Sequence, residues 1–318
     1  MYVLKNMVGD TISRFNAGHR MCAGCGTPVI VRTVLRAVKK EDHVVVSNAT
    51  GCLEVSSTIY PYTAWKDSYI HTAFASSAAA ISGVEGAYNA LKRKGKLKEG
   101  DTKFIVFSGD GGTYDIGLQS LSGAIERGHD FTYVCYDNGG YMNTGIQRSS
   151  ATPEFAKTTT TPIGTKISGK VEKRKDLTGI IERHHIPYLA QTAITNNFKD
   201  LYTKSEKAIY TEGPTFLNVF SPCPTGWGYP TEDMMEVSKL AVETCYWPLF
   251  EVINGRYIVN YKPINKKPVE EFLKTQKRFA HMFKEENRWM IDQFQEEVDK
   301  EWEKLLKLEE MTKKDEQE

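Results

Sequence analysis

The regular alternation of short apolar runs with helical stretches, from the N-terminus to Phe220, most constrains the fold. Strands are predicted at residues 44–46, 103–107, 131–136, 215–220 and, more weakly, 187–190. Helices are predicted near residues 27–39, 73–93, 115–127, 176–184 and 196–209. The apolar residues of each strand are continuous, which is typical of strands buried on both faces. The pattern therefore predicts an α/β fold with a mostly parallel sheet and helices on both faces.

The composition is that of an ordinary globular protein. Of the 318 residues, 40% are hydrophobic and 25% are charged, which excludes disorder or a coiled-coil rod as the main state. A net charge of +1 gives no general attraction to nucleic acid or to acidic lipid. No apolar run reaches the length of a membrane span, and the start of the chain lacks the layout of a signal peptide. We therefore expect a cytoplasmic protein without nucleic-acid or membrane partners.

The chain changes character after residue 230. We expect a first domain over residues 1–230 and a helical C-terminal extension over residues 231–318. Within the extension, the pattern predicts a helix near 232–247, a short strand near 257–259 and a frayed tail over 309–318.

An apolar stripe runs along the last predicted helix at three- and four-residue steps, the spacing of one helix face. It consists of Ile291, Phe294, Val298, Trp302 and Leu305. Two interpretations remain open at this point. The helix packs on its own domain, or it is an arm that docks on another subunit.

A glycine-rich segment, Gly-Asp-Gly-Gly at residues 109–112, directly follows the strand that is predicted to end at Phe107. Loops at the carboxyl ends of strands are where open α/β sheets bind ligands. The glycines let a diphosphate approach the backbone, and the helix predicted to begin near Asp115 offers free N–H groups. Asp110 is a hard oxygen ligand of the kind that Mg²⁺ prefers. Such a segment taken alone is more often a plain turn.

Asn138 strengthens the interpretation of this loop as a ligand site. It lies at the end of the next predicted strand after Asp110. A βαβ crossover takes about 30 residues and returns a parallel strand beside the first, and the separation of Asp110 and Asn138 matches that length. Both side chains are therefore expected at one sheet edge, where two oxygen ligands, a glycine loop and a helix N-terminus would form a Mg²⁺–diphosphate site. Gly-Asp-Gly followed at this distance by Asn is the pattern of thiamine diphosphate enzymes.

The cysteines form a second group at the same edge. Six are too few for a disulfide scaffold, and spaced cysteines in a reducing compartment more often bind metal. Cys22 and Cys25 form a Cys-x-x-Cys turn, and Cys52 and Cys223 each follow a predicted strand. Their spacing permits either zinc or a [4Fe–4S] cluster. The combination favours the cluster, because a redox group beside thiamine can remove electrons, whereas a structural zinc would have no task there.

Six segments carry a resemblance to a known family. They are residues 19–26 (HRMCAGCG), 48–55 (NATGCLEV), 60–65 (YPYTAW), 109–115 (GDGGTYD), 136–138 (YDN) and 141–149 (YMNTGIQRS). They resemble the beta subunits of pyruvate:ferredoxin oxidoreductase (pyruvate synthase), in the superfamily of 2-oxoacid:ferredoxin oxidoreductases. The resemblance extends from residue 14 to residue 265. It implies the fold of the diphosphate-binding half of a thiamine enzyme.

The resemblance also implies roles for individual residues. The [4Fe–4S] cluster would be held by Cys22, Cys25, Cys52 and Cys223. The Mg²⁺ ion would be held by Asp110, Asn138 and the backbone carbonyl of Gly140. Asn143 would be the catalytic residue, near the thiazolium and the substrate. Thiamine diphosphate would be contacted by Thr50, Gly51, Cys52, His71, Gly109, Asp110, Gly111, Gly112, Asn138, Gly140, Tyr141, Asn143 and Thr144, although a purely structural role is the alternative for His71.

The activity that the resemblance implies is the thiamine diphosphate-dependent oxidative decarboxylation of pyruvate to acetyl-CoA and CO₂. Electrons would pass through the cluster to ferredoxin, and coenzyme A would take the acetyl group. An alpha subunit would supply the pyrimidine half of the thiamine site, and gamma and delta subunits would carry further iron–sulfur clusters. This sequence holds no second Cys-x-x-Cys for such clusters. The chain alone is therefore expected to be inactive.

Two segments depart from the family's pattern. Gly139 and Gly140 follow Asn138 where an acidic residue is usual, and residues 74–76 (Phe-Ala-Ser) replace a more polar, often acidic, segment. Fewer negative groups would ease binding of a more anionic substrate. The alternative hypothesis is therefore an oxalate oxidoreductase that makes CO₂ without coenzyme A. Less favoured alternatives are a zinc-stabilised phosphate-binding module without redox function and a non-redox thiamine enzyme.

Three further features receive plainer interpretations. Cys135 is expected inside a strand and Cys245 inside a helix, both as buried, inert thiols. The basic run at residues 173–175 (Lys-Arg-Lys), which precedes a predicted helix, is expected to be a solvated face. A ferredoxin or phosphate contact is the weaker alternative for that run.

Overall fold

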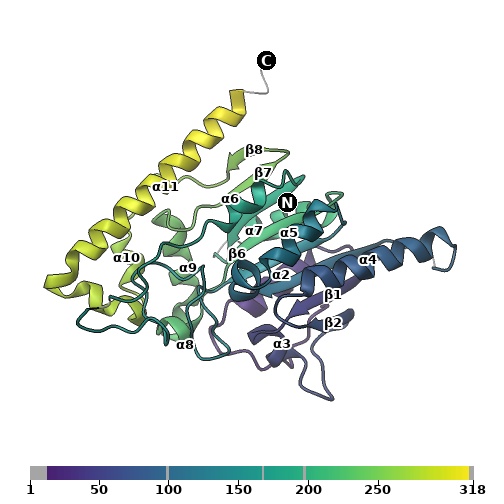
Figure 1. Ribbon diagram of the computed structural model, residues 1–318, viewed down its shortest axis with the longest axis horizontal. Coiled ribbons are helices and arrows are strands. Elements are labelled where there is room, and N and C mark those ends of the chain that lie inside the picture. The colour runs from purple at the N-terminus through teal and green to yellow at the C-terminus, as the bar shows by residue number, and fades with distance from the viewer. Residues whose placement is uncertain (1–12, 98–99, 167, 196–197, 315–318) are drawn as a thin grey trace.

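The computed structural model describes residues 13–97, 100–166, 168–195 and 198–314. Its strands form one eight-stranded sheet in the order β2-β1-β3-β4-β6-β5-β7-β8 (Figure 1). They are β1 (His43–Ala49), β2 (Ser68–Thr72), β3 (Thr102–Gly109), β4 (Thr132–Asp137), β5 (Tyr188–Ala193), β6 (Thr215–Phe220), β7 (Phe250–Ile253) and β8 (Arg256–Val259). All five strands predicted between the N-terminus and Phe220 are present, and β8 matches the short strand expected near 257–259.

The helices alternate with the strands as far as β6 and then follow one another toward the C-terminus. They are α2 (Thr27–Arg36), α3 (Cys52–Ser57), α4 (Ser77–Arg93), α5 (Leu118–Glu126), α6 (Leu177–Glu182), α7 (Lys199–Tyr210), α8 (Pro224–Trp227), α9 (Met234–Glu243), α10 (Glu270–Leu273) and α11 (Arg288–Lys314). A π-helical turn, η1 (Gly111–Asp115), and the short 3₁₀ segments η2 (Thr231–Asp233), η3 (Lys277–Phe283) and η4 (Glu285–Asn287) complete the set. Residues 196 and 197, where the sequence predicts the start of one helix, lie outside the described residues.

The first six strands in the sheet order are parallel, as predicted. Their register sets where the loops emerge: Asn48 pairs with Phe107, Gly109 pairs with Tyr136 and Asp137 pairs with Phe220. The carboxyl ends of β1, β3, β4 and β6 therefore lie along one edge of the sheet. The loops that follow these four strands carry most of the residues predicted to bind cofactor or metal.

Helices cover both faces of the sheet, which confirms the predicted layers (Figure 1). On β3, Ile105 and Phe107 point into one core with α2 and α7, while Phe104 and Val106 point into the other with α4, α5 and α6. All four side chains are buried. This two-sided burial is the physical reason why the strand sequences are continuously apolar.

Two strands were missed by the sequence analysis. β7 lies antiparallel to β5 and adds, with β8, a hairpin to the sheet edge. The charged residue Glu251 interrupts the apolar run of β7, so the sequence did not predict a buried strand there. Glu251 is nevertheless buried, and it accepts hydrogen bonds from Tyr188 Oη at 2.8 Å and Lys207 Nζ at 2.8 Å. β2 is short and polar and is only partly buried. Residues 250–259 thus join the same sheet as the earlier strands. The domain boundary expected at residue 230 stays a prediction.

The apolar stripe of α11 packs within this chain. Ile291, Phe294 and Val298 belong to a third core with α9, α10 and the segment around Trp227, and Leu305 packs on the sheet. Figure 1 shows α11 as the long helix that passes α10 and α9 and runs toward the C-terminus. The interpretation of a helix packed on its own domain is therefore confirmed for the stripe.

The predicted frayed tail is wrong for residues 309–314. α11 continues to Lys314, and Glu309 accepts hydrogen bonds from the backbone N–H of Val259 at 2.8 Å and from Lys262 Nζ at 2.5 Å. Contacts with β8 thus stabilise the last turns of α11, which lie beyond the end of its apolar stripe. Among the described residues, no helix is long and apolar enough to cross a membrane.

Truncation of Phe294 tests whether α11 is part of the fold. Phe294 is 6% exposed and its ring lies 5.7 Å from that of Tyr246. We expect Phe294→Ala to lower the free energy of unfolding by about 3–5 kcal/mol, because a large buried ring is lost and a cavity remains. Urea denaturation followed by circular dichroism measures the change. Met311→Ala, on the same helix at a position 64% exposed, is the control and should change it by less than about 0.5 kcal/mol. Equal small effects would mean that the helix is not part of the cooperative fold.

Candidate cofactor and metal site

A small hollow lies at the carboxyl edge of the sheet. Its walls are Thr50, Gly51, Cys52, Phe74, Gly109, Gly111, Gly112, Tyr136, Asn138, Gly140, Tyr141, Met142, Asn143 and Thr144. Eleven of the thirteen predicted cofactor contacts are among them. The other two lie close by: Asp110 is fully buried next to Gly109 and Gly111, and His71 Nε2 lies 2.9 Å from Thr50 Oγ1, a wall residue. The structure thus brings the predicted residues together, while their roles stay predictions.

Three wall residues were missed from the sequence. Tyr136 was assigned only to strand packing, although its register opposite Gly109 could have placed it at this edge. Phe74 packs against Tyr141 with ring centroids 5.9 Å apart, and Met142 lies beside Gly140. Apolar residues give no chemical signal in a sequence, so their contribution to a site becomes visible only in the fold.

The glycines of the 109–112 loop are required by close packing. A Cβ atom at Gly111 would lie 2.4 Å from the ring of Tyr141, and one at Gly112 would lie 2.6 Å from Ser108 Oγ. The hydroxyl of Tyr141 donates to the carbonyl of Gly111 at 3.1 Å. The loop then continues as the turn η1. Only residues without a side chain fit beneath these neighbours, which leaves the backbone of the loop accessible to the hollow.

Asp110, Asn138 and Gly140 direct oxygen-bearing groups toward one another. The same terminal atom of the Asn138 amide lies 2.9 Å from Asp110 Oδ1 and 2.9 Å from the carbonyl oxygen of Gly140. In one orientation of the amide this atom is the nitrogen, which donates to both oxygens. In the other orientation it is the amide oxygen, so that a carboxylate, an amide oxygen and a carbonyl converge. These three oxygens are a donor set that suits Mg²⁺.

The electrostatics of Asp110 fit a cation. Burial raises the pKa of its carboxyl group, and the neighbouring charge of Asp137 raises it further. Hydrogen bonds from Ser149 Oγ and from the backbone N–H of Asn138 oppose this effect. A divalent cation would compensate the buried charge directly. The residues present therefore fit the predicted Mg²⁺ site.

The four predicted cluster cysteines are neighbours in the fold. Burial raises the pKa of the Cys52 thiol to about 12, and the nearby thiols of Cys223, Cys25 and Cys22 contribute to the rise. Burial likewise raises the pKa of Cys223 to about 11, again with a contribution from Cys25 and Cys22. Residues far apart in the sequence are thus electrostatically coupled, as the shared sheet edge requires.

Three of these thiols lie at the start of a helix. Cys52 is the first residue of α3, Cys223 caps α8 and accepts from the N–H of Gly226 at 3.3 Å, and Cys25 directly precedes the cap of α2. Helix N-termini favour negative charge, so they favour thiolate ligands.

The side chain of Tyr136 lies between Gly51, the residue before Cys52, and Gly109 of the glycine loop. Its hydroxyl lies 3.1 Å from where a Cβ atom of Gly51 would be, and its ring lies 3.2 Å from the corresponding position at Gly109. The ring is buried, and its hydroxyl finds no hydrogen-bond partner among the described residues. Cys52 itself lines the hollow. The predicted cluster thiols and the predicted phosphate loop therefore share one continuous site.

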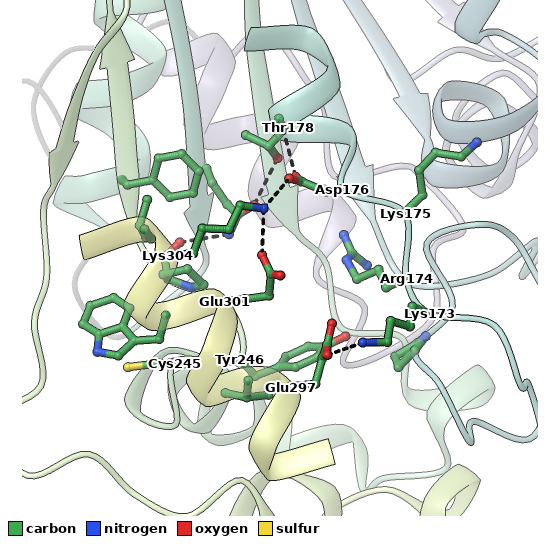
Figure 2. Close-up of a pocket in the computed structure, with 18 of the residues that line it drawn as sticks. Lys173, Arg174, Lys175, Asp176, Thr178, Cys245, Tyr246, Glu297, Glu301 and Lys304 are labelled. Atoms are coloured by element: carbon green, nitrogen blue, oxygen red, sulfur yellow. Dashed lines mark hydrogen bonds and ion pairs between the residues drawn. The ribbon is translucent and has the colours of Figure 1, made fainter. Parts of the chain in front are cut away.

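A larger cavity of about 410 Å³ lies elsewhere, between α11 and the sheet (Figure 2). Its walls contain none of the predicted cofactor residues. Ion pairs cross it, including Lys173 with Glu297 and Lys304 with Asp176. Cys245 is a wall residue and is buried, as predicted, but it follows α9 at a φ of 59° and does not lie inside a helix. Cys135 is fully buried within β4, as predicted.

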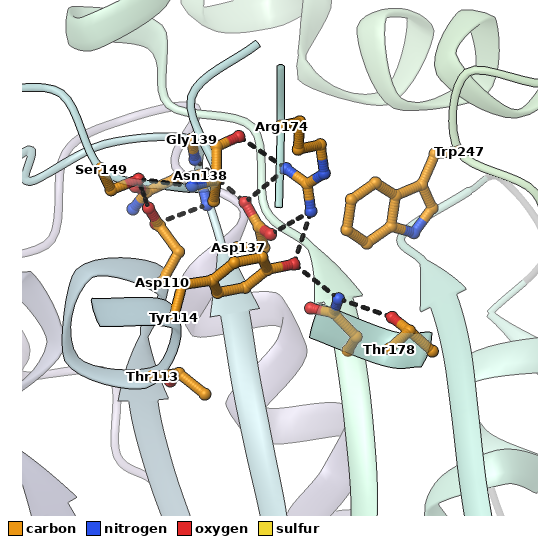
Figure 3. A network of polar contacts seen from close by, with 12 residues as sticks. Asp110, Thr113, Tyr114, Asp137, Asn138, Gly139, Ser149, Arg174, Thr178 and Trp247 are labelled. Carbon is orange, nitrogen blue, oxygen red and sulfur yellow. Dashed lines mark hydrogen bonds and ion pairs between the residues drawn. The ribbon is translucent and has the colours of Figure 1, made fainter. Parts of the chain in front are cut away.

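The basic run at residues 173–175 is not a uniformly solvated face, which corrects the sequence interpretation. Lys173 lies at the surface, but Arg174 turns inward and forms an ion pair with Asp137, whose side chain is 2% exposed (Figure 3). Lys175 Nζ donates to the carbonyl of Tyr114. A run of like charges does not reveal which member faces a buried carboxylate, because the partner is distant in the sequence.

Comparisons with known proteins agree with this architecture. Residues 49–219 match the family model described as thiamine pyrophosphate enzyme, C-terminal TPP binding domain. The chain is 54% identical over 300 residues to pyruvate synthase subunit PorB of Thermotoga maritima, covering 93% of this chain and 92% of that protein. It is 45% identical over 299 residues to ketoisovalerate oxidoreductase subunit VorB of Pyrococcus furiosus, covering 93% and 94%.

A solved structure shares the fold. It is the 2-oxoglutarate:ferredoxin oxidoreductase from Magnetococcus marinus, with a TM-score of 0.54 and 24% sequence identity. The likeness covers 68% of this chain and 72% of that chain. At this identity it bears on the fold alone.

The thiol environments predict an order of alkylation. In chain prepared without iron, we expect iodoacetamide at pH 8 to label the exposed Cys22 first. Cys52 should react much more slowly, because a thiol whose pKa is raised to about 12 is almost entirely protonated at pH 8. Its rate should climb as the pH rises toward that value. Mass spectrometry of the labelled peptides measures both rates, and urea-unfolded chain is the control. Labelling of Cys52 at the rate of Cys22 would contradict this account of the site.

Proposed function

Because this chain belongs to the family of 2-oxoacid:ferredoxin oxidoreductase beta subunits, we propose that it works in the oxidative decarboxylation of pyruvate to acetyl-CoA and CO₂. It is a subunit of a multi-subunit oxidoreductase and carries a thiamine diphosphate-binding domain. The observation that carries the proposal is the meeting of the glycine loop, the oxygen donors and four cysteines at one sheet edge.

In this proposal the chain holds the diphosphate end of the cofactor. Asp110, Asn138 and the carbonyl of Gly140 would hold the Mg²⁺ ion, and the backbone of Gly111 and Gly112, which lines the hollow, would bind the diphosphate. Thiamine diphosphate supplies the electron sink that allows a 2-oxo acid to lose CO₂. Asn143, on the exposed lip of the hollow, is placed to donate a hydrogen bond to charge that develops on the substrate.

Cys22, Cys25, Cys52 and Cys223 would hold a [4Fe–4S] cluster, which supplies a one-electron acceptor next to the hollow. Cys52 belongs both to this set and to the wall of the hollow. Tyr136 and the walls around it exclude water between the two sites. A cluster held there would supply a one-electron acceptor for the oxidation, and the place of Cys52 in the wall supports the redox interpretation over a structural zinc.

Pyruvate is favoured over the oxalate alternative. The relatives reported above act, by their names, on pyruvate and on ketoisovalerate, and the comparisons give the oxalate hypothesis no support. The two departures that suggested it also have structural reasons. Gly139 adopts a φ of 69° and donates its N–H to Asp137, and Phe74 packs against Tyr141 as a wall of the hollow.

The partners are part of the proposal. An alpha subunit would complete the pyrimidine half of the thiamine site, and gamma and delta subunits would carry electrons onward through further clusters to ferredoxin. Tyr60 and Tyr62 are 94% and 76% exposed, so the loop after α3 offers apolar surface to a partner. A cytoplasmic location remains our expectation from the sequence.

Substrate assays of the purified complex test the proposal. We expect viologen reduction to be fastest with pyruvate and coenzyme A, slower with 2-oxoisovalerate and coenzyme A, and absent with oxalate alone. Asp110→Asn should lower the pyruvate rate by at least about 100-fold, since even residues that only support a metal ligand commonly contribute about 10- to 100-fold. Asp101→Asn, at a carboxylate 68% exposed and away from the site, is the matched control. Turnover of oxalate without turnover of pyruvate would overturn the substrate assignment.

A further inference from the structure

We propose that Arg174 is a positioning residue for the Mg²⁺ ligands, acting through Asp137 and through the loop at residues 149–152. The inference rests on the proposed function, because it assumes that Asp110, Asn138 and Gly140 hold the ion. It extends that function by assigning a role to a side chain outside the hollow. Figure 3 shows the contacts on which it depends.

Arg174 holds the end of β4 through Asp137. Its Nη2 donates to Asp137 Oδ2 at 2.5 Å, and the other carboxylate oxygen, Oδ1, accepts from the backbone N–H of Gly139 at 3.1 Å. Asn138 and Gly140 are the immediate neighbours of Gly139. The ion pair therefore fixes the turn that presents two of the three proposed oxygen ligands.

Arg174 also holds the loop that supports the third ligand. Its Nη1 donates to the carbonyl of Ala151 at 2.7 Å. The same loop donates from Ser149 Oγ to Asp110 Oδ2 and from Thr152 Oγ1 to the carbonyl of Gly139 at 2.8 Å. One guanidinium thus joins the segment that orients Asp110 to the segment that carries Asn138 and Gly140.

The Arg174 guanidinium interacts differently with two buried carboxylates, Asp110 and Asp137. Asp110 and Asp137 are 0% and 2% exposed, and the charge of Asp137 raises the pKa of the Asp110 carboxyl group. Arg174 forms an ion pair with Asp137. It also lowers the pKa of Asp110, but less than the hydrogen bonds from Ser149 and Asn138 do, and the metal ion would supply the remaining compensation of Asp110. Without Arg174, Asp137 would be an uncompensated buried carboxylate next to the ligand-bearing turn and would compete for the cation or repel Asp110.

An arginine suits this position better than a lysine. The guanidinium reaches Asp137 and Ala151 with different nitrogens, and Nη2 also donates to the hydroxyl of Tyr114 at 2.5 Å. Its carbon lies 4.8 Å from the ring centroid of Trp247 and 5.2 Å from that of Tyr114, so the ring faces hold its plane. A lysine could keep the charge but could not make these contacts at once.

The test measures Mg²⁺ affinity in the intact complex instead of turnover. The complex is stripped with chelator, and Mg²⁺ is titrated at fixed thiamine diphosphate while bound cofactor is followed by circular dichroism or by calorimetry. We expect Arg174→Gln to raise the apparent Kd for Mg²⁺ by about 10- to 100-fold, the range found for residues that orient metal ligands. Arg174→Lys should give a smaller increase. The iron content of the complex should not change, because Arg174 contacts none of the four cysteines.

Two companion variants separate positioning from folding and from general electrostatics. Lys173→Gln removes the same charge one residue earlier, from a side chain 60% exposed that pairs with Glu297, and should leave the Kd unchanged. Asp137→Asn keeps the volume of the carboxylate and should also weaken Mg²⁺ binding. It tests the same ion pair if Arg174→Gln fails to assemble. Adding Asp137→Asn to Arg174→Gln should recover part of the loss, because the uncompensated charge disappears.

An unchanged Kd in Arg174→Gln, or an equal increase in Lys173→Gln, would overturn the inference. Either result is distinguishable from failure of the proposed function. If the wild-type complex binds thiamine diphosphate without requiring Mg²⁺, the function is wrong. If the wild type requires Mg²⁺ and Arg174→Gln binds it equally well, only the role of Arg174 is wrong.

Discussion

The parallel pairing of β1, β3, β4 and β6 is the constraint on which the rest of the site depends. Parallel strands in register end together, so the loops after Ala49, Gly109, Asp137 and Phe220 emerge along one edge of the sheet. Helices on both faces make this pairing stable by burying both sides of each strand. Chemical groups from segments as distant in the sequence as Cys52 and Cys223 are thereby brought together without any long-range motif.

This edge gathers more buried acidic groups than an apolar interior can hold in ionised form without compensation. Two carboxylates and a set of thiols lie within electrostatic reach of one another. Arg174 and the N-terminal ends of α3 and α8 favour the ionised forms, and the proposed metal groups would compensate the remainder. In this view the division of labour between Asp110 and Asp137 follows from which of them the arginine reaches.

Much of the site could be predicted from sequence because its parts have chemical signatures. The separation of Asp110 and Asn138 matched one crossover, and Cys-x-x-Cys is typical of metal sites, so both groups were predicted at the edge where the structure places Asp110, Asn138 and Cys52. Arg174 could not be recognised, because nothing local distinguishes it from Lys173 and Lys175. β7 was missed for a similar reason: the partners that neutralise Glu251 come from other elements. Sequence patterns reveal residues whose role is local, and they miss residues whose role depends on a distant partner.

The central claim is that one sheet edge holds a redox cluster beside a thiamine site, and iron analysis tests it most directly. We would measure iron, acid-labile sulfide and zinc in this chain purified without oxygen, and record its EPR spectrum after dithionite reduction. The account predicts roughly four irons and four sulfides per chain and the signal of a reduced [4Fe–4S] cluster, both lost in Cys52→Ala. Zinc in place of iron, or an iron content unaffected by Cys52→Ala, would contradict it.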